Sequence, residues 1–251
     1  MSKYAVIFPA GGRSARFSGK EKKPFTNLDG RAVWLRSVEI FVTRNDVCQC
    51  IIVVAPDDQE FFRSRFGPNL AFMSVRIANG GAERFESVSN ALAMVEPEAD
   101  FVAIHDAVRP CITEEQINAV FHKAQETGAA ILGVPVADTL KRVDSTGKIE
   151  ATPPRQGLWQ AQTPQVFRRD WLVEAYAQRG QLKSQITDDA QLVEAAGHPV
   201  VVVEGSPLNI KITTKADIYL AEAILKSRPK PKAPKQYHPF AEEEMWGGSG
   251  S

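Results

Sequence analysis

The sequence predicts an α/β protein whose sheet is mostly parallel and is covered by helices on both faces. Amphipathic segments at 33–42, 84–94 and 114–127 alternate with short apolar runs, and this alternation is typical of parallel sheets that are buried on both faces. The apolar runs predict six strands: 5–8, 51–55, 75–77, 101–105, 129–134 and 200–204. Because ligands of such sheets gather at the carboxyl ends of the strands, we expect the functional residues in the loops after the first, third and fourth strands.

Two of the helices carry recognisable start signals. The segment Thr113-Glu114-Glu115-Gln116 is a capping box, in which the Thr and Gln side chains satisfy free N–H groups at the start of a helix. Another helix is expected to begin at Thr214, with Asp217 in its first turn, and to run to about residue 226. Together these elements predict a Rossmann-like, twisted sheet.

One stretch departs from the alternation. Residues 138–143 and 148–152 flank the turn Asp144-Ser145-Thr146-Gly147 and predict a protruding β-hairpin arm, about 138–155 in all. A two-stranded hairpin is marginally stable by itself in water. We therefore expect the arm to pack on a second subunit and to form a homodimer.

The chain is expected to hold one domain over residues 1–227. Beyond it, residues 228–251 begin with alternating Pro and Lys, become acidic, and end in Gly-Gly-Ser-Gly-Ser. Such a composition cannot bury a core, so the segment is predicted to be a disordered tail whose last residues resemble an added linker.

Composition limits the possible partners. Among the 251 residues, 30 Lys and Arg balance 30 Asp and Glu, so no overall charge directs the protein to nucleic acid or to a membrane surface. No stretch approaches the length of a transmembrane helix, and residues 1–4 lead into a strand without a secretory signal. Cys48, Cys50 and Cys111 lack the spacing of a zinc site and are interpreted as structural. The expected location is the reducing cytoplasm.

The loop after the first strand is the strongest functional signal. It reads Pro9-Ala10-Gly11-Gly12-Arg13-Ser14-Ala15-Arg16, and a turn containing Lys23 follows. Small residues let the backbone approach phosphates and donate N–H groups to them, while Arg16 and Lys23 supply positive charge. The loop is neither a P-loop nor a dinucleotide-binding glycine pattern. A glycine-rich turn with solvated charges is the alternative, but the order of features favours a seat for a nucleoside triphosphate.

A second signal follows the fourth strand, where Asp106 and Arg109 are three residues apart. A carboxylate at the end of a buried strand, facing a triphosphate loop, could hold Mg²⁺, which prefers carboxylate and phosphate oxygens. A surface ion pair between the two residues is about as plausible from this segment alone. His105, within the strand, is interpreted as a packed, hydrogen-bonded histidine.

Three further segments gain meaning only in combination. The loop from Asn79 to Ser87 contains Gly80 and Gly81, whose backbone could read a flat base edge. By itself it is an ordinary strand-to-helix turn. Arg155 and Lys211 are ordinary exposed basic residues unless the fold brings them to the same cleft.

In this order and spacing, the segments resemble the 2-C-methyl-D-erythritol 4-phosphate cytidylyltransferase family, bacterial nucleotidyltransferases of non-mevalonate isoprenoid synthesis. The resemblance extends over almost everything from residue 4 to about 226. No single segment is decisive, but their joint order is specific. The matching segments are 9–16, 80–87, 105–110, 138–142, 157–165, 187–188 and 209–213.

The resemblance implies four catalytic residues. Arg16, Lys23 and Lys211 would bind the phosphates of CTP, and Asp106 would help to hold Mg²⁺ or the nucleotide. The nucleotide would further contact six residues: Ala10, Gly11, Gly12, Gly81, Ala82 and Ser87.

The resemblance also implies an acceptor site shared between two subunits. Arg109, Thr139 and Arg155 would hold the methylerythritol phosphate, with Thr139 and Arg155 supplied by the arm of the partner subunit.

The chain departs from the family pattern in three places. Lys22-Lys23-Pro24 stands where the family has Pro-Lys-Gln, so Lys22 is an alternative cation. Ala82 replaces a more common Asp, which puts side-chain contacts to cytosine in doubt but leaves backbone contacts intact. Residues 152–154 are stiffer than usual because two of them are proline.

The implied reaction transfers CMP from CTP to 2-C-methyl-D-erythritol 4-phosphate and releases pyrophosphate. A phosphate monoester is already an anionic nucleophile at neutral pH, so the attack needs no general base. Clustered cations and Mg²⁺ would instead bring two anions together and stabilise the charge that develops.

Other functions remain open at this point. The acceptor could be another polyol phosphate, such as ribitol 5-phosphate, and the nucleotide could be UTP, GTP or ATP, although a purine would need a roomier pocket. A non-catalytic nucleotide-binding module is possible, but the combination of Arg16, Lys23, Asp106 and Lys211 argues against it. An oxidoreductase is disfavoured because the first loop has the wrong glycine spacing.

Overall fold

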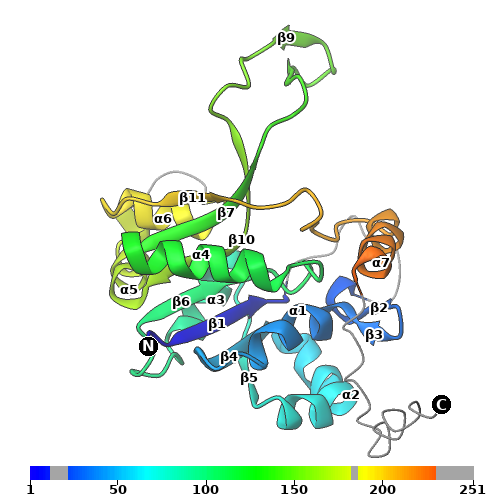
Figure 1. Cartoon of the computed structure of the whole chain (residues 1–251), viewed down its shortest axis with the longest axis vertical. Helices are drawn as coiled ribbons and strands as arrows, with labels where there is room; N and C mark the ends of the chain where they lie inside the picture. Colours follow the sequence, from blue (N-terminus) through cyan, green and yellow to red (C-terminus); the bar gives the residue numbers. More distant parts are fainter. Residues whose placement is uncertain (12–21, 182–185, 230–251) are drawn as a thin grey trace, which may run out of the picture.

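A seven-stranded sheet forms the centre of the computed structural model, which describes residues 1–11, 22–181 and 186–229. Its strands are β1 (Tyr4–Pro9), β4 (Val47–Val54), β5 (Val75–Asn79), β6 (Phe101–Ile104), β7 (Ala129–Pro135), β10 (Trp159–Arg168) and β11 (Val201–Glu204). They are ordered β11-β7-β10-β6-β1-β4-β5 (Figure 1). Within this sheet only β10 runs antiparallel to its neighbours. The predictions for Gly12, Arg16 and residues 230–251 lie outside the described residues.

Helices cover both faces of the sheet, as predicted. One face carries α1 (Val33–Val42), α2 (Gln59–Phe72) and α4 (Glu114–Thr127). The other face carries α3 (Arg84–Leu92), α5 (Arg169–Ala177) and α6 (Asp189–Ala195). A smaller apolar cluster joins α7 (Ala216–Ser227) to the two-stranded ribbon of β2 (Asn27–Leu28) and β3 (Arg31–Ala32). In the part of the chain that the structure describes, no helix could cross a bilayer.

The first strand shows why the sheet must be covered by apolar layers on both of its faces. All residues from Tyr4 to Phe8 are fully buried. Tyr4, Val6 and Phe8 pack into the cluster with α1 and α4, whereas Ala5 and Ile7 pack into the cluster with α3. Side chains alternate along a strand, so a continuous apolar run needs an apolar layer on each face.

Most elements lie where the sequence predicts them. The helices over 33–42 and 114–127 are confirmed, and so is the capping box, in which Thr113 Oγ1 accepts from Gln116 N and Gln116 Oε1 accepts from Thr113 N. The last helix begins at Ala216 instead of Thr214, because Asp217 Oδ2 accepts from the backbone N–H groups of Thr213 and Thr214. His105 comes one residue after β6 rather than within it.

Two long elements were not predicted. The sequence of β10 is interrupted by polar residues, yet Gln162, Thr163 and Gln165 are buried because their side chains are hydrogen-bonded inside the protein. α2 continues through Pro68, although proline inside a helix removes a hydrogen bond. The shorter helices α5 and α6 were also missed.

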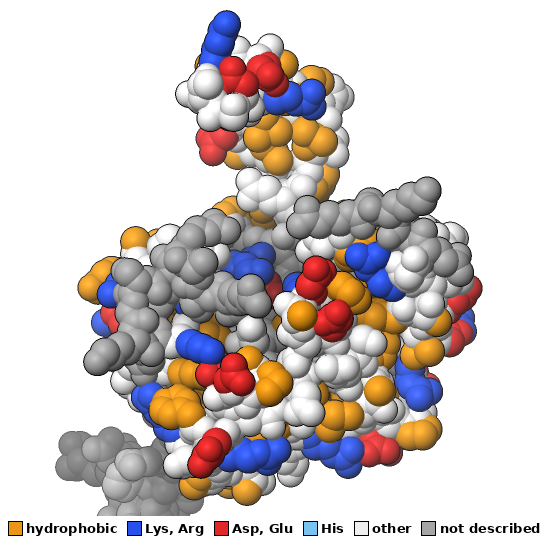
Figure 2. Space-filling view, turned by 180° about the vertical axis from the view of Figure 1, so that it is seen from behind, with side chains coloured by type: hydrophobic (Ala, Val, Ile, Leu, Met, Phe, Trp, Pro, Cys, Tyr) orange, Lys and Arg blue, Asp and Glu red, His pale blue; other side chains and the backbone are white. Residues whose placement is uncertain are grey.

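The predicted arm is present and projects away from the body of the protein (Figure 1). Its strands are β8 (Arg142–Val143) and β9 (Ile149–Ala151). Asp144 Oδ1 accepts from the N–H groups of Thr146 and Lys148 at 2.8 and 3.0 Å and fixes the turn. The side chains of Val143 and Ile149 are more than half exposed, and Figure 2 shows hydrophobic side chains among the charged ones on the arm.

Candidate active site

A cleft of about 670 Å³ lies at the carboxyl ends of the parallel strands. Its lining comes from the loops after β1, β4, β5 and β6 and from the segment after β11. Basic side chains lie in a hollow of the body beneath the arm (Figure 2). Eight of the predicted site residues line this one cleft: Ala10, Gly11, Lys23, Gly81, Ala82, Ser87, Asp106 and Lys211.

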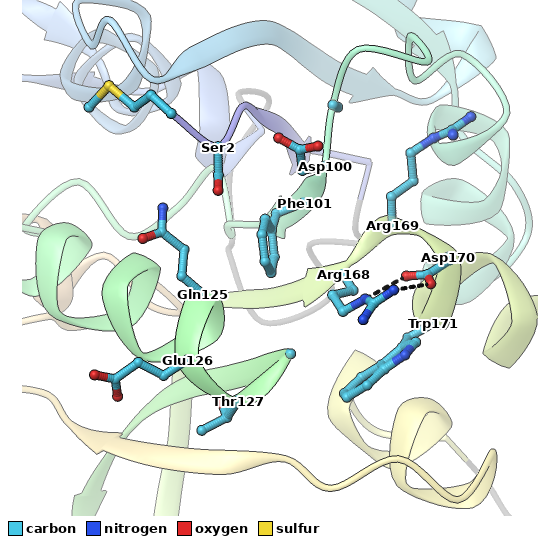
Figure 3. Close-up of a pocket in the computed structure, with 13 residues that line it drawn as sticks. Ser2, Asp100, Phe101, Gln125, Glu126, Thr127, Arg168, Arg169, Asp170 and Trp171 are labelled. Carbon is cyan, nitrogen blue, oxygen red and sulfur yellow. Dashed lines mark hydrogen bonds and ion pairs between the residues drawn. The ribbon is translucent and has the colours of Figure 1, made fainter.

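A second cavity, of about 760 Å³, lies at the opposite edge of the sheet, where β6 begins (Figure 3). Arg168 and Asp170, both on its wall, are paired with each other at 2.6 Å. The predicted site residues that the structure describes lie elsewhere. Because ligands of such sheets bind at the carboxyl ends of the strands, the smaller cleft is the candidate active site.

Asp106 forms the floor of the cleft and is surrounded by three cations. Its Oδ2 is 2.8 Å from Lys211 Nζ and 3.5 Å from Arg109 Nε, and its Oδ1 is 3.9 Å from Arg84 Nη2. Burial alone would raise the pKa of Asp106, but Lys211, Arg84 and Arg109 together hold that pKa well below its usual range. The carboxylate is therefore ionised at neutral pH.

Arg109 is held from two sides. Besides its ion pair with Asp106, it donates from Nη1 to the carbonyl oxygen of Asn209 at 2.6 Å. Asn209 is fully buried and donates from Nδ2 to Thr163 O at 3.0 Å. The pair between Asp106 and Arg109 that the sequence suggested is thus present, but it is buried beneath the cleft rather than on the surface.

The second glycine loop is held together by its own polar groups. Glu86 Oε2 accepts from Ala82 N at 2.7 Å, and Ser87 Oγ accepts from Gly81 N at 3.0 Å. A Cβ atom at Gly81 would lie 2.4 Å from the Cβ of Glu86, so the loop requires glycine there. Glu86 shapes this wall of the cleft, a role that sequence reasoning did not assign.

Thr139 and Arg155 are placed differently from the other predicted residues. Both are exposed and lie near the base of the arm, where the Arg155 guanidinium donates to the carbonyl oxygen of Ala137. Neither Thr139 nor Arg155 is among the described residues that line the cleft. A single chain therefore does not bring them to Asp106 and Lys211.

Arg84 is the main charged residue of the cleft that sequence reasoning missed. It is the first residue of α3, lines the cleft, and lies 2.7 Å from the buried carboxylate of Asp189. Its position just after the second glycine loop was the only available signal. Its acidic partner lies far along the chain, so no local pattern marks the pair.

His105 is a packed histidine, as predicted. It is fully buried, its Nε2 is 3.2 Å from Arg109 O, and its Nδ1 is 3.2 Å from Thr163 Oγ1. Its ring lies edge-on to Phe8. Burial lowers the pKa of His105 to about 4, so the imidazole is neutral in the folded protein at neutral pH.

Folding stability is expected to fall with acid because of His105. Its folded-state pKa of about 4 lies below the value of about 6.5 for an unfolded chain. As the pH falls, the unfolded state therefore takes up a proton on His105 before the folded state does. The neutral His105 contributes about 3 kcal/mol to the free energy of unfolding, and this contribution is complete above pH 6.5 and is lost as the pH falls towards 4. Urea unfolding should show that the free energy of unfolding falls more between pH 7 and pH 5 in the wild type than in His105→Asn. Equal losses in the two proteins would contradict the assignment.

The fold and the cleft together define a class of protein. Small-residue loops and clustered Lys and Arg side chains at the carboxyl ends of a mostly parallel sheet form a site for a nucleotide's phosphates. Beside this cleft, the buried His105 is engaged in packing and hydrogen bonding. The class is that of the α/β nucleotidyltransferases.

Comparison with known proteins gives the family. The family model for 2-C-methyl-D-erythritol 4-phosphate cytidylyltransferase matches residues 4–227. The Rhodopirellula baltica protein of that name is 42% identical over 233 residues, which cover 88% of this chain and 94% of that protein. The Francisella tularensis structure of that name is 30% identical, with a TM-score of 0.76 over 89% of this chain and 100% of the other. The corresponding structure from Thermus thermophilus is 30% identical, with a TM-score of 0.74 over 90% of this chain and 100% of the other. The chain belongs to this cytidylyltransferase family.

Proposed function

We propose that the protein transfers CMP from CTP to 2-C-methyl-D-erythritol 4-phosphate and releases pyrophosphate, a step of non-mevalonate isoprenoid precursor synthesis. The names of its relatives support this activity. The observation that carries the proposal is the meeting of Lys23, Asp106 and Lys211 in one cleft beside two loops of small residues.

The reaction follows from the charges in the cleft. A phosphate oxygen of the acceptor forms a bond to the α-phosphorus of CTP, and the bond from that phosphorus to the bridging oxygen of pyrophosphate breaks. Two opposite unit charges 4 Å apart near a protein surface attract by about 4 kcal/mol. Lys23 and Lys211 would act in this way on the triphosphate and on the departing pyrophosphate, together with Arg16 from outside the described residues.

The cleft suits a divalent cation held jointly by protein and nucleotide. Mg²⁺ is commonly bound through one or two carboxylates together with substrate phosphates. Asp106 supplies one such carboxylate, and the described residues contain no cluster of three or more metal-ligating side chains. When bound, Mg²⁺ would neutralise phosphate charge and so favour departure of pyrophosphate.

The acceptor site is proposed to form between two copies of the chain. Thr139 and Arg155 lie near the base of an arm whose apolar residues Val143 and Ile149 are exposed. Both Thr139 and Arg155 would reach the cleft of a partner subunit, beneath which Arg109 is paired with Asp106. Sedimentation at assay concentration should give a dimer. A monomer with full activity would contradict this arrangement.

The proposal places one catalytic domain over residues 1–227, consistent with the family match to residues 4–227. A cytoplasmic setting is supported by the thiols of Cys48, Cys50 and Cys111, which are free and suit a reducing compartment.

The test is release of pyrophosphate from CTP in the presence of Mg²⁺ and each of two acceptors. Methylerythritol phosphate is expected to be the better acceptor, with ribitol 5-phosphate as the competing one. Parallel reactions with UTP, GTP and ATP test the nucleotide. Faster turnover with ribitol phosphate would reassign the acceptor, and no pyrophosphate with either acceptor would overturn the function.

A further inference from the structure

Arg84 lies between two carboxylates and is much closer to one of them. Its Nη2 is 2.7 Å from Asp189 Oδ2 but 3.9 Å from Asp106 Oδ1. Both acids are buried, and Asp189 lies outside the cleft lining. The closer contact with Asp189 therefore determines where the guanidinium sits.

Asp189 is itself held firmly in place. Its Oδ1 accepts from the hydroxyl of Tyr176 at 2.6 Å, and its backbone N–H donates to Gln165 Oε1 at 3.1 Å. Tyr176 belongs to α5, Asp189 to α6 and Gln165 to β10, so α5 holds the carboxylate of Asp189 and β10 holds its backbone. Burial and the neighbouring Asp189 raise the pKa of Tyr176 well above its usual value, which keeps the hydroxyl protonated as a donor.

The two oxygens of Asp106 are not equivalent. Oδ2 is occupied by Lys211 and Arg109, at 2.8 and 3.5 Å. Among the described residues, the ion pair at Oδ1 is the long one with Arg84. If Arg84 moved to contact distance, cations of the protein itself would occupy both oxygens, and neither would be available to a ligand in the cleft.

We propose that Asp189 is a positioning residue, which holds Arg84 away from Asp106 and so keeps Oδ1 of Asp106 available to the complex of CTP with Mg²⁺. The physical basis is competition between two buried carboxylates for one guanidinium. This inference rests on the proposed function, because it concerns how the same cleft receives its nucleotide.

The test removes the charge of Asp189 and measures CTP binding by calorimetry with and without Mg²⁺. In Asp189→Asn, the metal-free Kd for CTP is expected to stay within about threefold of the wild type, while the tightening caused by Mg²⁺ falls about tenfold. A role in stability alone would weaken both values together. The control Glu194→Gln removes an exposed acid from the same helix and should behave like the wild type.

A double variant gives the sharper result. In Arg84→Gln/Asp189→Asn the guanidinium that would close on Asp106 is absent, so the effect of Mg²⁺ on the Kd for CTP should return. The inference is overturned if Asp189→Asn keeps the full Mg²⁺ effect, or if the double variant does not regain it.

Two further measurements cover the remaining outcomes. Tyr176→Phe loosens Asp189 without changing its charge, so it replaces Asp189→Asn if that variant fails to fold. A partial loss of the Mg²⁺ effect in Tyr176→Phe would support the inference, and no loss would overturn it. Pyrophosphate release by the wild type is measured in parallel. Its absence would count against the proposed function, whereas the binding comparison tests the role of Asp189 separately.

Discussion

Replacement of Lys211 by alanine is expected to lower kcat by about 10²-fold or more, the effect of losing one donor that stabilises a transition state. Of the described cations, Lys211 is the closest to Asp106, at 2.8 Å, yet it lines the cleft and 44% of its side chain is exposed. It can therefore contact a phosphate while Arg109 and Arg84 still neutralise Asp106. The measurement is pyrophosphate release at saturating CTP and acceptor.

The control for this variant is Lys215→Ala, which removes an exposed lysine from the same segment. Lys215 makes no side-chain cap to the following helix, so its loss should leave both stability and turnover unchanged. Near-wild-type kcat in Lys211→Ala would remove Lys211 from the mechanism. The same expectation, of about 10²-fold or more, applies to Lys23→Ala.

The second large effect is expected from Asp106→Asn, which should separate binding from turnover. Without the carboxylate, the cations around it act on the nucleotide alone, so metal-free CTP should bind several times more tightly than to the wild type. Turnover should nevertheless fall by about 10²-fold, because the cleft loses its ligand for Mg²⁺. Calorimetry without Mg²⁺ and a rate assay with Mg²⁺ measure the two effects.

Asp170→Asn is the matched control for this variant. It removes a carboxylate that is paired with Arg168 in the cavity at the other edge of the sheet (Figure 3). Neither CTP affinity nor turnover should change. If Asp106→Asn bound metal-free CTP more weakly, then Asp106 would be a direct contact of the nucleotide rather than a source of repulsion.

The sequence predicted the sheet and the cleft because both depend on local patterns. An apolar run such as 5–8 can be satisfied only by two covering layers, and the residues that follow such runs must meet at one edge. Ala10, Asp106 and Gly81 follow three different strands and line the same cleft for that reason.

The residues that were missed are defined by contacts between distant parts of the chain. Gln165 and Thr163 look like loop residues in the sequence, but each is buried in β10 with its polar atoms bonded to other elements. Arg84 meets Asp189 only when α3 and α6 pack on the same face. No spacing rule contains such a pairing, because the three-dimensional fold alone creates it.

The arm leads into the strand that contacts Asp106. The chain leaves the arm directly into β10, and within that strand the hydroxyl of Thr163 accepts from the N–H of Asp106. When the pairing of a strand with its neighbours shifts by one residue, each of its side chains points to the opposite face of the sheet. A change in the length of the hairpin at its tip, around Asp144, would therefore leave the contact between Thr163 and Asp106 undisturbed. An insertion inside β10, between Trp159 and Thr163, would instead put one part of the strand out of phase with its neighbours β6 and β7.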